Sequence, residues 1–128
     1  MEIIGNGVDI IKNSRIKKLI KNPKFVSRIF TEDEINASRK IKNKTNFFAK
    51  RFAAKEAFVK SIGTGFRKGI NFNDINVKNN KLGKPILSFN NNVRKILIQK
   101  FKSNKFSIYV SLSDEKYYSI AYVIINKL

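Results

Sequence analysis

The segment RFAAKEAFVKSIGTGF, residues 51–66, carries the strongest structural signal in this chain. Its apolar side chains, with those just before it, recur at helical spacing, which predicts a long helix that begins at Thr45 and ends at Gly63. In such a helix Glu56 and Lys60 are four residues apart and lie on the same face. The segment therefore predicts a central helix that presents a carboxylate and a lysine together.

Size and composition indicate one folded domain, residues 1–128. A chain of this length buries roughly two-thirds of its unfolded surface, and 42% hydrophobic residues, with eleven Phe, argue against disorder. The absence of cysteine excludes disulfides, a thiol nucleophile and a Cys-ligated zinc site. The absence of histidine excludes a His-based triad and an imidazole base. The candidate reactive groups are therefore carboxylates, lysines and arginines.

The formal net charge of +18 indicates an anionic partner, such as nucleic acid, a phosphorylated cofactor, an acidic protein or a membrane surface. Lysine is abundant together with asparagine and isoleucine, so compositional bias explains this charge equally well. No apolar run approaches the ~20 residues that span a bilayer, and MEIIGNGVDII at the amino terminus lacks the pattern of a signal peptide. We therefore expect a cytoplasmic protein with no membrane span.

The other segments predict an α+β fold with a mainly antiparallel sheet packed around the central helix. Capping signals place one helix after Asn13 or Ser14, and another after Thr31, whose spacing to Glu34 matches a capping box and which is expected to run to about Ile41. A further helix is expected to start at residues 90–92, and strands are expected at 3–11, 72–77, 85–89, 106–112 and 119–125. This order is not a regular βαβ alternation, so a mainly antiparallel sheet is predicted.

Two carboxylates are candidate metal ligands. Asp9 lies in an apolar strand interrupted by Gly5 and Gly7, where an ionised side chain needs a cation, a metal or several N–H donors. Glu56 lies among apolar residues, and two separated carboxylates near lysines suit a magnesium-bound diphosphate. Structural alternatives stay open. Asp9 can end its strand or cap the next helix, and Glu56 with Lys60 can form an exposed ion pair worth about 0.3–0.5 kcal/mol.

Several motifs, in order along almost the whole chain, point to one family: GNGVDI followed by Arg15-Ile16, FVSRIFT, RFAAKEAFVKSIGTG, FNDINV, GKP and SLSDEKYYSIAYVII. Together they resemble the holo-(acyl-carrier-protein) synthases, the small stand-alone class of 4′-phosphopantetheinyl transferases. The resemblance implies transfer of 4′-phosphopantetheine from coenzyme A to a serine of apo acyl carrier protein, with release of adenosine 3′,5′-bisphosphate, in fatty acid biosynthesis. It also implies Mg²⁺ and a homotrimer with active sites between neighbouring protomers.

The resemblance also implies three groups of site residues. Asp9 and Glu56 match the metal-binding acids, and Lys60 matches the lysine beside the phosphates, so Glu56 and Lys60 are the expected catalytic residues. The positions that match the coenzyme A cleft are Arg51, Lys55, Gly63, Thr64, Gly65, Gly83, Lys84 and Pro85. The positions that match the surface for the acidic helix of the carrier protein are Arg15, Phe25 and Arg28.

One position departs from the family pattern. Members usually carry histidine where this chain has Asp114, and a carboxylate repels a phosphate unless it is protonated or bound to a metal. Asp114 can join the metal shell or face solvent at the turn. Without histidine, the serine proton has three possible acceptors: Glu56, a metal-bound water or Asp114. We expect Glu56, directly or through a water.

Two other functional classes fit parts of the sequence. The charge and the aromatic residues Tyr117, Tyr118 and Tyr122 are compatible with a small nucleic-acid-binding protein, although no motif of such proteins is present and the tyrosines are expected to alternate across a strand. A relative that has lost catalysis and binds coenzyme A or carrier protein as a scaffold is the other alternative. We expect the enzyme, because coenzyme A and acyl carrier proteins are both anionic.

Overall fold

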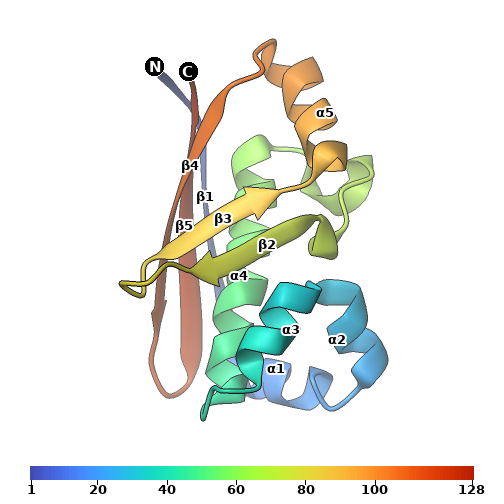
Figure 1. Cartoon of the computed structure of the whole chain (residues 1–128), viewed down its shortest axis with the longest axis vertical. Helices are drawn as coiled ribbons and strands as arrows, with labels where there is room; N and C mark the ends of the chain where they lie inside the picture. The colour runs from blue at the N-terminus through green and yellow to red at the C-terminus, as the bar shows by residue number, and fades with distance from the viewer.

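A computed structural model describes residues 1–128, apart from the side chains of Arg67 and Lys68. The first half contains β1 (Glu2–Lys12), α1 (Asn13–Leu19), α2 (Pro23–Ile29), α3 (Glu32–Ser38) and the long helix α4 (Lys44–Ile62). Two short 3₁₀ turns, Gly65–Lys68 and Phe72–Asp74, lead into the second half. That half contains β2 (Ile75–Asn79), β3 (Pro85–Phe89), α5 (Asn91–Phe101), β4 (Phe106–Asp114) and β5 (Tyr118–Lys127), as shown in Figure 1.

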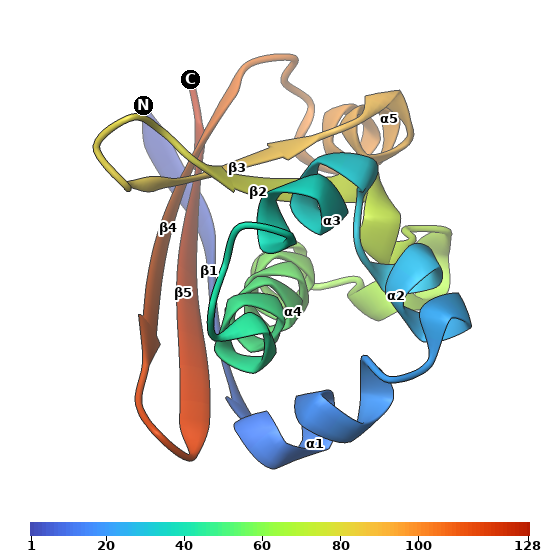
Figure 2. The same ribbon diagram turned by 60° about the horizontal axis from the view of Figure 1, so that its bottom comes forward.

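The strands form two antiparallel sheets, which confirms the predicted fold class. The larger sheet has the order β1-β5-β4, and the smaller is the β2-β3 hairpin. Helix α4 packs along one face of the larger sheet, with the short helices on its far side (Figure 2). No helix in the part of the chain that the structure describes has the length and apolar character needed to cross a membrane.

Two glycines bring β1 into direct backbone contact with α4. A side-chain Cβ at Gly5 would overlap the carbonyl oxygen of Ser61, and one at Gly7 would overlap that of Ala57. The register of β1 against β5 also shifts between Ile3 and Gly5, as in a β-bulge. Only glycine permits this approach, which places the following residues of β1 against the middle of α4.

The ends of the helices agree with the sequence in part. Helix α4 ends at Gly63, whose φ of 85° is the left-handed conformation of a helix C-cap. Its predicted start at Thr45 is wrong, because Asn43 is the cap and accepts a hydrogen bond from the amide of Asn46 at 3.1 Å. The Thr31 capping box is confirmed, with both reciprocal hydrogen bonds present, but α3 ends at Ser38.

Three local predictions differ from the structure. Helix α1 begins at Asn13 without a side-chain cap, because the Asn13 side chain is buried and bonds to the β4–β5 turn. Helix α2 was not predicted, although Pro23 occupies its first turn and Asn22 accepts a hydrogen bond from Lys24 N–H. Strand β2 begins only at Ile75, because the preceding three residues form a 3₁₀ turn.

Candidate active site

Asp9 and Lys60 form the central contact of the candidate site. The ammonium group of Lys60 lies 3.0 Å from Asp9 Oδ1 and donates a second hydrogen bond, at 3.1 Å, to the carbonyl oxygen of Val8. The Asp9 side chain is 16% exposed and that of Lys60 is 55% exposed, so the pair borders solvent. Asp9 is therefore neither buried without a partner nor used as a helix cap.

Glu56 lies beside this pair. Burial raises the pKa of the Glu56 carboxyl group and the negative charge of Asp9 raises it further, while Lys60 and Arg15 act in the opposite direction. Among the ion pairs formed by described side chains, Lys60 pairs with Asp9, and an isolated Glu56–Lys60 pair on the helix surface is not found. Strand β1, helix α1 and helix α4 thus bring two carboxylates and two cations together.

This arrangement fits a divalent cation of the magnesium type. Burial and, after it, the charge of Asp9 raise the pKa of the Glu56 carboxyl group, and a bound cation would offset both effects. No cluster of three or more metal-ligating side chains occurs among the side chains that the structure describes. Mg²⁺ is nevertheless often held by one or two carboxylates, with phosphate and water oxygens completing its shell. Asp9 and Glu56 are the residues that would hold it.

The glycine-bracketed turn follows Lys60 directly. Gly63 and Gly65 both have positive φ values, 85° and 63°, and the Thr64 hydroxyl donates a hydrogen bond to the Gly65 carbonyl at 3.0 Å. From α5, Lys100 donates a hydrogen bond to the last carbonyl of α4, at Ile62. The turn is therefore fixed at the end of α4 that carries Lys60.

Lys55 and Arg51, both expected at the coenzyme A cleft, are almost completely buried in this structure. Lys55 is fully buried, with its ammonium group 2.7 Å from Glu34 Oε1 and donating to three main-chain carbonyls. Arg51 is 3% exposed and donates to Phe47 O and Asn79 Oδ1. Lys55 consequently belongs to the protein core, which does not agree with the expected direct contact to coenzyme A. Arg51 borders a separate cavity of about 440 Å³ on the α3 and β2 side.

Of the three residues expected at the carrier-protein surface, two are exposed and one is buried. Arg15 and Arg28 are exposed, on α1 and α2. Phe25 is only 8% exposed, and its ring packs near those of Phe30 and Phe52, with centroid distances of 6.3 and 6.4 Å. Phe25 therefore packs α2 against the core, and its ring is not exposed to a partner in this structure.

The turn Gly83-Lys84-Pro85 and Asp9 lie at opposite edges of the larger sheet within one chain. It forms the tip of the β2–β3 hairpin, and Figures 1 and 2 both show this tip on the β4 side of the larger sheet. Asp9 lies on β1, the opposite edge of that sheet. The predicted coenzyme A residues are thus split between the two edges of one protomer.

Asp114 is neutralised within its own chain. Its carboxylate lies 3.3 Å from Lys50 Nζ and accepts a hydrogen bond from Asn46 Nδ2 at 2.8 Å. Sequence reasoning missed both partners, although their four-residue spacing on α4 places them on one face. Of the two expectations for Asp114, the solvent-facing position agrees with its 31% exposed side chain.

Comparison with known proteins identifies the family of this chain. The family model of the 4′-phosphopantetheinyl transferase superfamily matches residues 5–123. The chain is 53% identical over 127 residues to a holo-[acyl-carrier-protein] synthase of Pelagibacter ubique, covering 99% of each. It is 47% identical over 130 residues to the synthase of Buchnera aphidicola, covering 99% of this chain and 100% of the relative.

Solved structures show the same fold. The crystal structure of a Bacillus anthracis holo-(acyl-carrier-protein) synthase in complex with CoA (3′,5′-ADP) is 37% identical, with a TM-score of 0.83 and complete coverage of both chains. The Neisseria meningitidis synthase is 36% identical with a TM-score of 0.87, covering 98% of this chain and 99% of its own. This chain therefore belongs to the 4′-phosphopantetheinyl transferase superfamily, and within it to the holo-[acyl-carrier-protein] synthase family.

Proposed function

We propose that the protein transfers 4′-phosphopantetheine from coenzyme A to a serine of apo acyl carrier protein, yielding the holo carrier protein and adenosine 3′,5′-bisphosphate for fatty acid biosynthesis. The observation that carries the proposal is the convergence of Asp9, Glu56 and Lys60 in a chain of this family. We place the reaction in the cytoplasm and in a single domain, residues 1–128. The basic surface around Arg15 and Arg28 suits an acidic carrier protein.

The chain's own residues divide the chemical work. The serine hydroxyl attacks the β-phosphate of coenzyme A, and Lys60 stabilises the negative charge that develops on the transferring and leaving oxygens. Glu56, directly or through a water, accepts the serine proton, a role that suits a carboxyl group whose pKa is raised. Asp9 holds Lys60 in position. When bound by Asp9 and Glu56, Mg²⁺ supplies charge neutralisation at the diphosphate.

Transfer is tested by mass spectrometry of apo acyl carrier protein after incubation with coenzyme A, Mg²⁺ and the protein. We expect the carrier protein to gain one phosphopantetheine group, and omission of Mg²⁺ to abolish the gain. A carrier protein whose serine is replaced by alanine is the control and should gain nothing. Tight coenzyme A binding with no gain in mass would contradict the enzyme and support the scaffold alternative.

We also propose that the active sites lie between protomers of a homotrimer. The outward face of the larger sheet is apolar, with Val8, Ile10, Ile120 and Tyr122 between 38% and 59% exposed. Val8 pairs with Tyr122, and Ile10 with Ile120, so these side chains form one continuous patch. A patch of this kind on a soluble chain indicates an interface. Tyr118 and Tyr122 lie on this same face and do not alternate across the strand as expected.

A trimer also explains the division of the predicted coenzyme A residues. Asp9 and Lys60 lie at the β1 edge of the larger sheet, whereas the Gly83–Pro85 turn lies at the β4 edge. One ligand can contact both groups if the β1 edge of one protomer meets the β4 edge of the next. Packing of the apolar faces around a threefold axis would produce this arrangement.

The trimer is tested by Tyr122→Lys, which places a charge at the centre of the apolar patch. We expect light scattering to give three times the chain mass for the unaltered protein and a smaller mass for the variant, with loss of transfer. Ile98→Lys is the matched control, since Ile98 is 38% exposed but lies on α5, away from the patch and from the Gly83–Pro85 turn. A monomeric unaltered protein with full transfer activity would overturn the proposal.

A further inference from the structure

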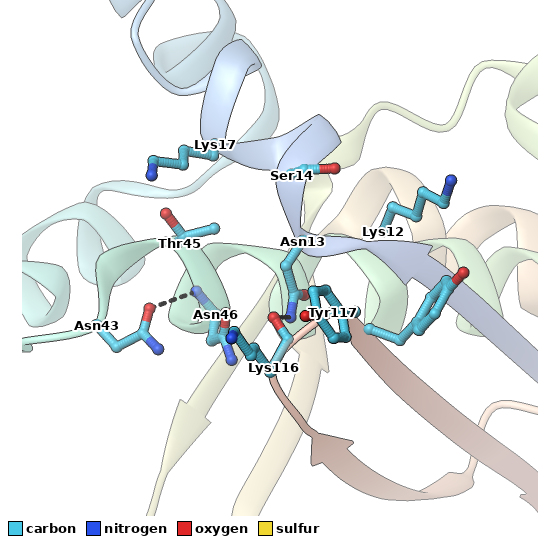
Figure 3. A pocket seen from close by; sticks show the side chains of 10 residues that line it. Lys12, Asn13, Ser14, Lys17, Asn43, Thr45, Asn46, Lys116 and Tyr117 are labelled. Carbon is cyan, nitrogen blue, oxygen red and sulfur yellow. Dashed lines mark hydrogen bonds between the residues drawn. The ribbon is translucent and has the colours of Figure 1, made fainter.

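A second concave site lies at the end of the larger sheet where β1 ends and β5 begins. Its volume is about 590 Å³, greater than that of the cavity beside Arg51, and within the range of about 300–1,000 Å³ typical of small-molecule sites. Three segments enclose it: the start of α1, the start of α4 and the β4–β5 turn (Figure 3). None of the proposed catalytic residues lines it. Its α4 residue Asn46 is ten residues before Glu56, about 15 Å along the helix.

The walls of this cavity are fixed by hydrogen bonds. The buried Asn13 side chain donates to the carbonyl oxygens of Glu115 and Lys116, at 2.9 and 3.2 Å, and accepts from the Ser119 hydroxyl. Its main-chain amide donates to Tyr117 O at 2.8 Å. These bonds join the start of α1 to the β4–β5 turn, so the cavity is preformed.

The lining carries positive charge only. Lys12, Lys17 and Lys116 border the cavity, and no acidic residue does. Among the ion pairs between described side chains, none involves these three lysines. Figure 3 shows Lys17 extending from α1 above Thr45, which lies in the first turn of α4. Among the described side chains, the three lysines of the lining therefore have no carboxylate partner within ion-pair distance.

The nearest carboxylates are engaged elsewhere. Asp114 is held by Lys50 and Asn46, as described above. The Glu115 side chain bonds within the β4–β5 turn. One of its carboxylate oxygens accepts hydrogen bonds from the amides of Tyr117 and Tyr118, at 2.9 and 2.7 Å. Neither acid lines the cavity, so neither competes for its lysines.

The cavity also receives the amino-terminal end of the longest helix. Helix α4 has 19 residues, and its first turn contributes Thr45 and Asn46 to the lining. The amides of a first helical turn have no acceptor within the helix, and they carry the positive end of the helix dipole. The amide of Asn46 donates a hydrogen bond to Asn43 Oδ1. The two preceding amides, of Lys44 and Thr45, are therefore left for an external acceptor.

We propose that this cavity binds a phosphorylated small molecule with two or more negative charges. Lys17, the Thr45 hydroxyl and the first-turn amides of α4 contact the phosphate oxygens from one side, and Lys116 contacts them from the other. Phosphate bound by a helix N-terminus and flanking lysines is a common combination. The inference does not depend on the proposed transferase activity, because it uses neither Asp9 nor Glu56.

The test is an NMR titration of the ¹⁵N-labelled protein with pyrophosphate, without Mg²⁺ and at ionic strength held constant with sodium chloride. We expect saturable shifts centred on the amides of Lys44, Thr45 and Lys116. The double variant Lys17→Gln/Lys116→Gln should bind about tenfold more weakly, since two charge-assisted contacts are lost. The control Lys95→Gln/Lys105→Gln removes the same charge from exposed positions outside the cavity and should bind as the unaltered protein does.

Two outcomes would overturn the proposal. If pyrophosphate binding is weakened equally in both double variants, the binding depends only on the net charge of the protein. Shifts confined to Lys60 and the Gly63–Gly65 turn would assign the binding to the candidate active site. A separate measurement of transfer by both double variants keeps the two proposals apart, because loss of pyrophosphate binding at α4 with unchanged transfer supports this site alone.

Discussion

The Glu56→Gln variant is expected to lose at least about 100-fold in the rate of phosphopantetheine transfer while keeping its fold. Glutamine has nearly the same shape as glutamate but cannot accept the serine proton and is a weaker ligand for Mg²⁺. Transfer is measured by mass spectrometry at saturating coenzyme A and carrier protein. Near-normal turnover would refute the role of Glu56 in both proton acceptance and metal binding.

The thermal stability of Glu56→Gln shows whether Glu56 acts in catalysis or stabilises the fold. Burial and the charge of Asp9 raise the pKa of Glu56, so the ionised form is disfavoured in the folded protein. At a pH above that raised pKa, the neutral amide removes the unfavourable charge. We expect the metal-free variant to melt no lower than the unaltered protein. The difference should vanish as the pH falls through the pKa and Glu56 itself becomes protonated.

A matched control is available on α3. Glu32→Gln makes the same chemical change at an exposed position in the first turn of that helix. We expect full transfer activity, together with a small loss of stability, because a carboxylate near a helix N-terminus typically contributes about 0.3–1 kcal/mol. Glu56→Gln should therefore lose activity without losing metal-free stability, whereas Glu32→Gln should keep its activity and lose a little stability.

The features that the sequence predicts well are those with a local signal. The periodic apolar residues of α4, its end at Gly63 and the Thr31 capping box each depend on neighbours within a few residues. The meeting of Asp9 with Lys60 is different, because it joins residues 51 positions apart. Gly5 and Gly7 are visible in the sequence as interruptions of an apolar strand, but nothing local identifies Ala57 and Ser61 as the residues they contact.

The burial of Lys55 could not be predicted from local sequence. Lysine is rarely fully buried unless it is paired, and its partner Glu34 lies in another helix. Glu34 already had a complete local explanation as the third helical residue of a capping box. The structure shows that it has a second role, since Glu34 Oε2 accepts a hydrogen bond from the amide of Val77 at 2.7 Å. The capping-box pattern of Glu34 therefore gave no indication of the other contacts that its carboxylate makes.

Replacement of Lys55 by methionine is expected to lower the free energy of unfolding by about 3–5 kcal/mol, because it leaves the buried Glu34 carboxylate without its cation. The change also removes the donor from the carbonyls of Ile29, Phe72 and Ile75, which lie in three different segments. Burial lowers the pKa of Lys55 and Glu34 opposes this effect, which is the pattern of a buried ion pair. Denaturant unfolding of the variant measures the loss.

Lys50→Met is the matched control, on the same helix. Lys50 also pairs with an acid, Asp114, but both side chains are partly exposed, and such pairs contribute about 0–1 kcal/mol. A double variant, Lys55→Met with Glu34→Gln, should be less destabilised than the sum of the two single variants, because no unpaired charge is left in the core. A Lys55→Met protein within about 1 kcal/mol of the unaltered one would contradict the buried pair.

The same variant decides between the two roles considered for Lys55. If Lys55 contacts coenzyme A, as the family resemblance implies, folded Lys55→Met protein should need much more coenzyme A for half-maximal transfer. If Lys55 acts only in the core, the folded fraction should transfer with an unchanged KM, and activity should fall only as the protein unfolds. The enclosure of its ammonium group by four oxygen atoms leads us to expect an unchanged KM. Lys60, more than half exposed beside Asp9, is then the lysine that we expect to contact the phosphates.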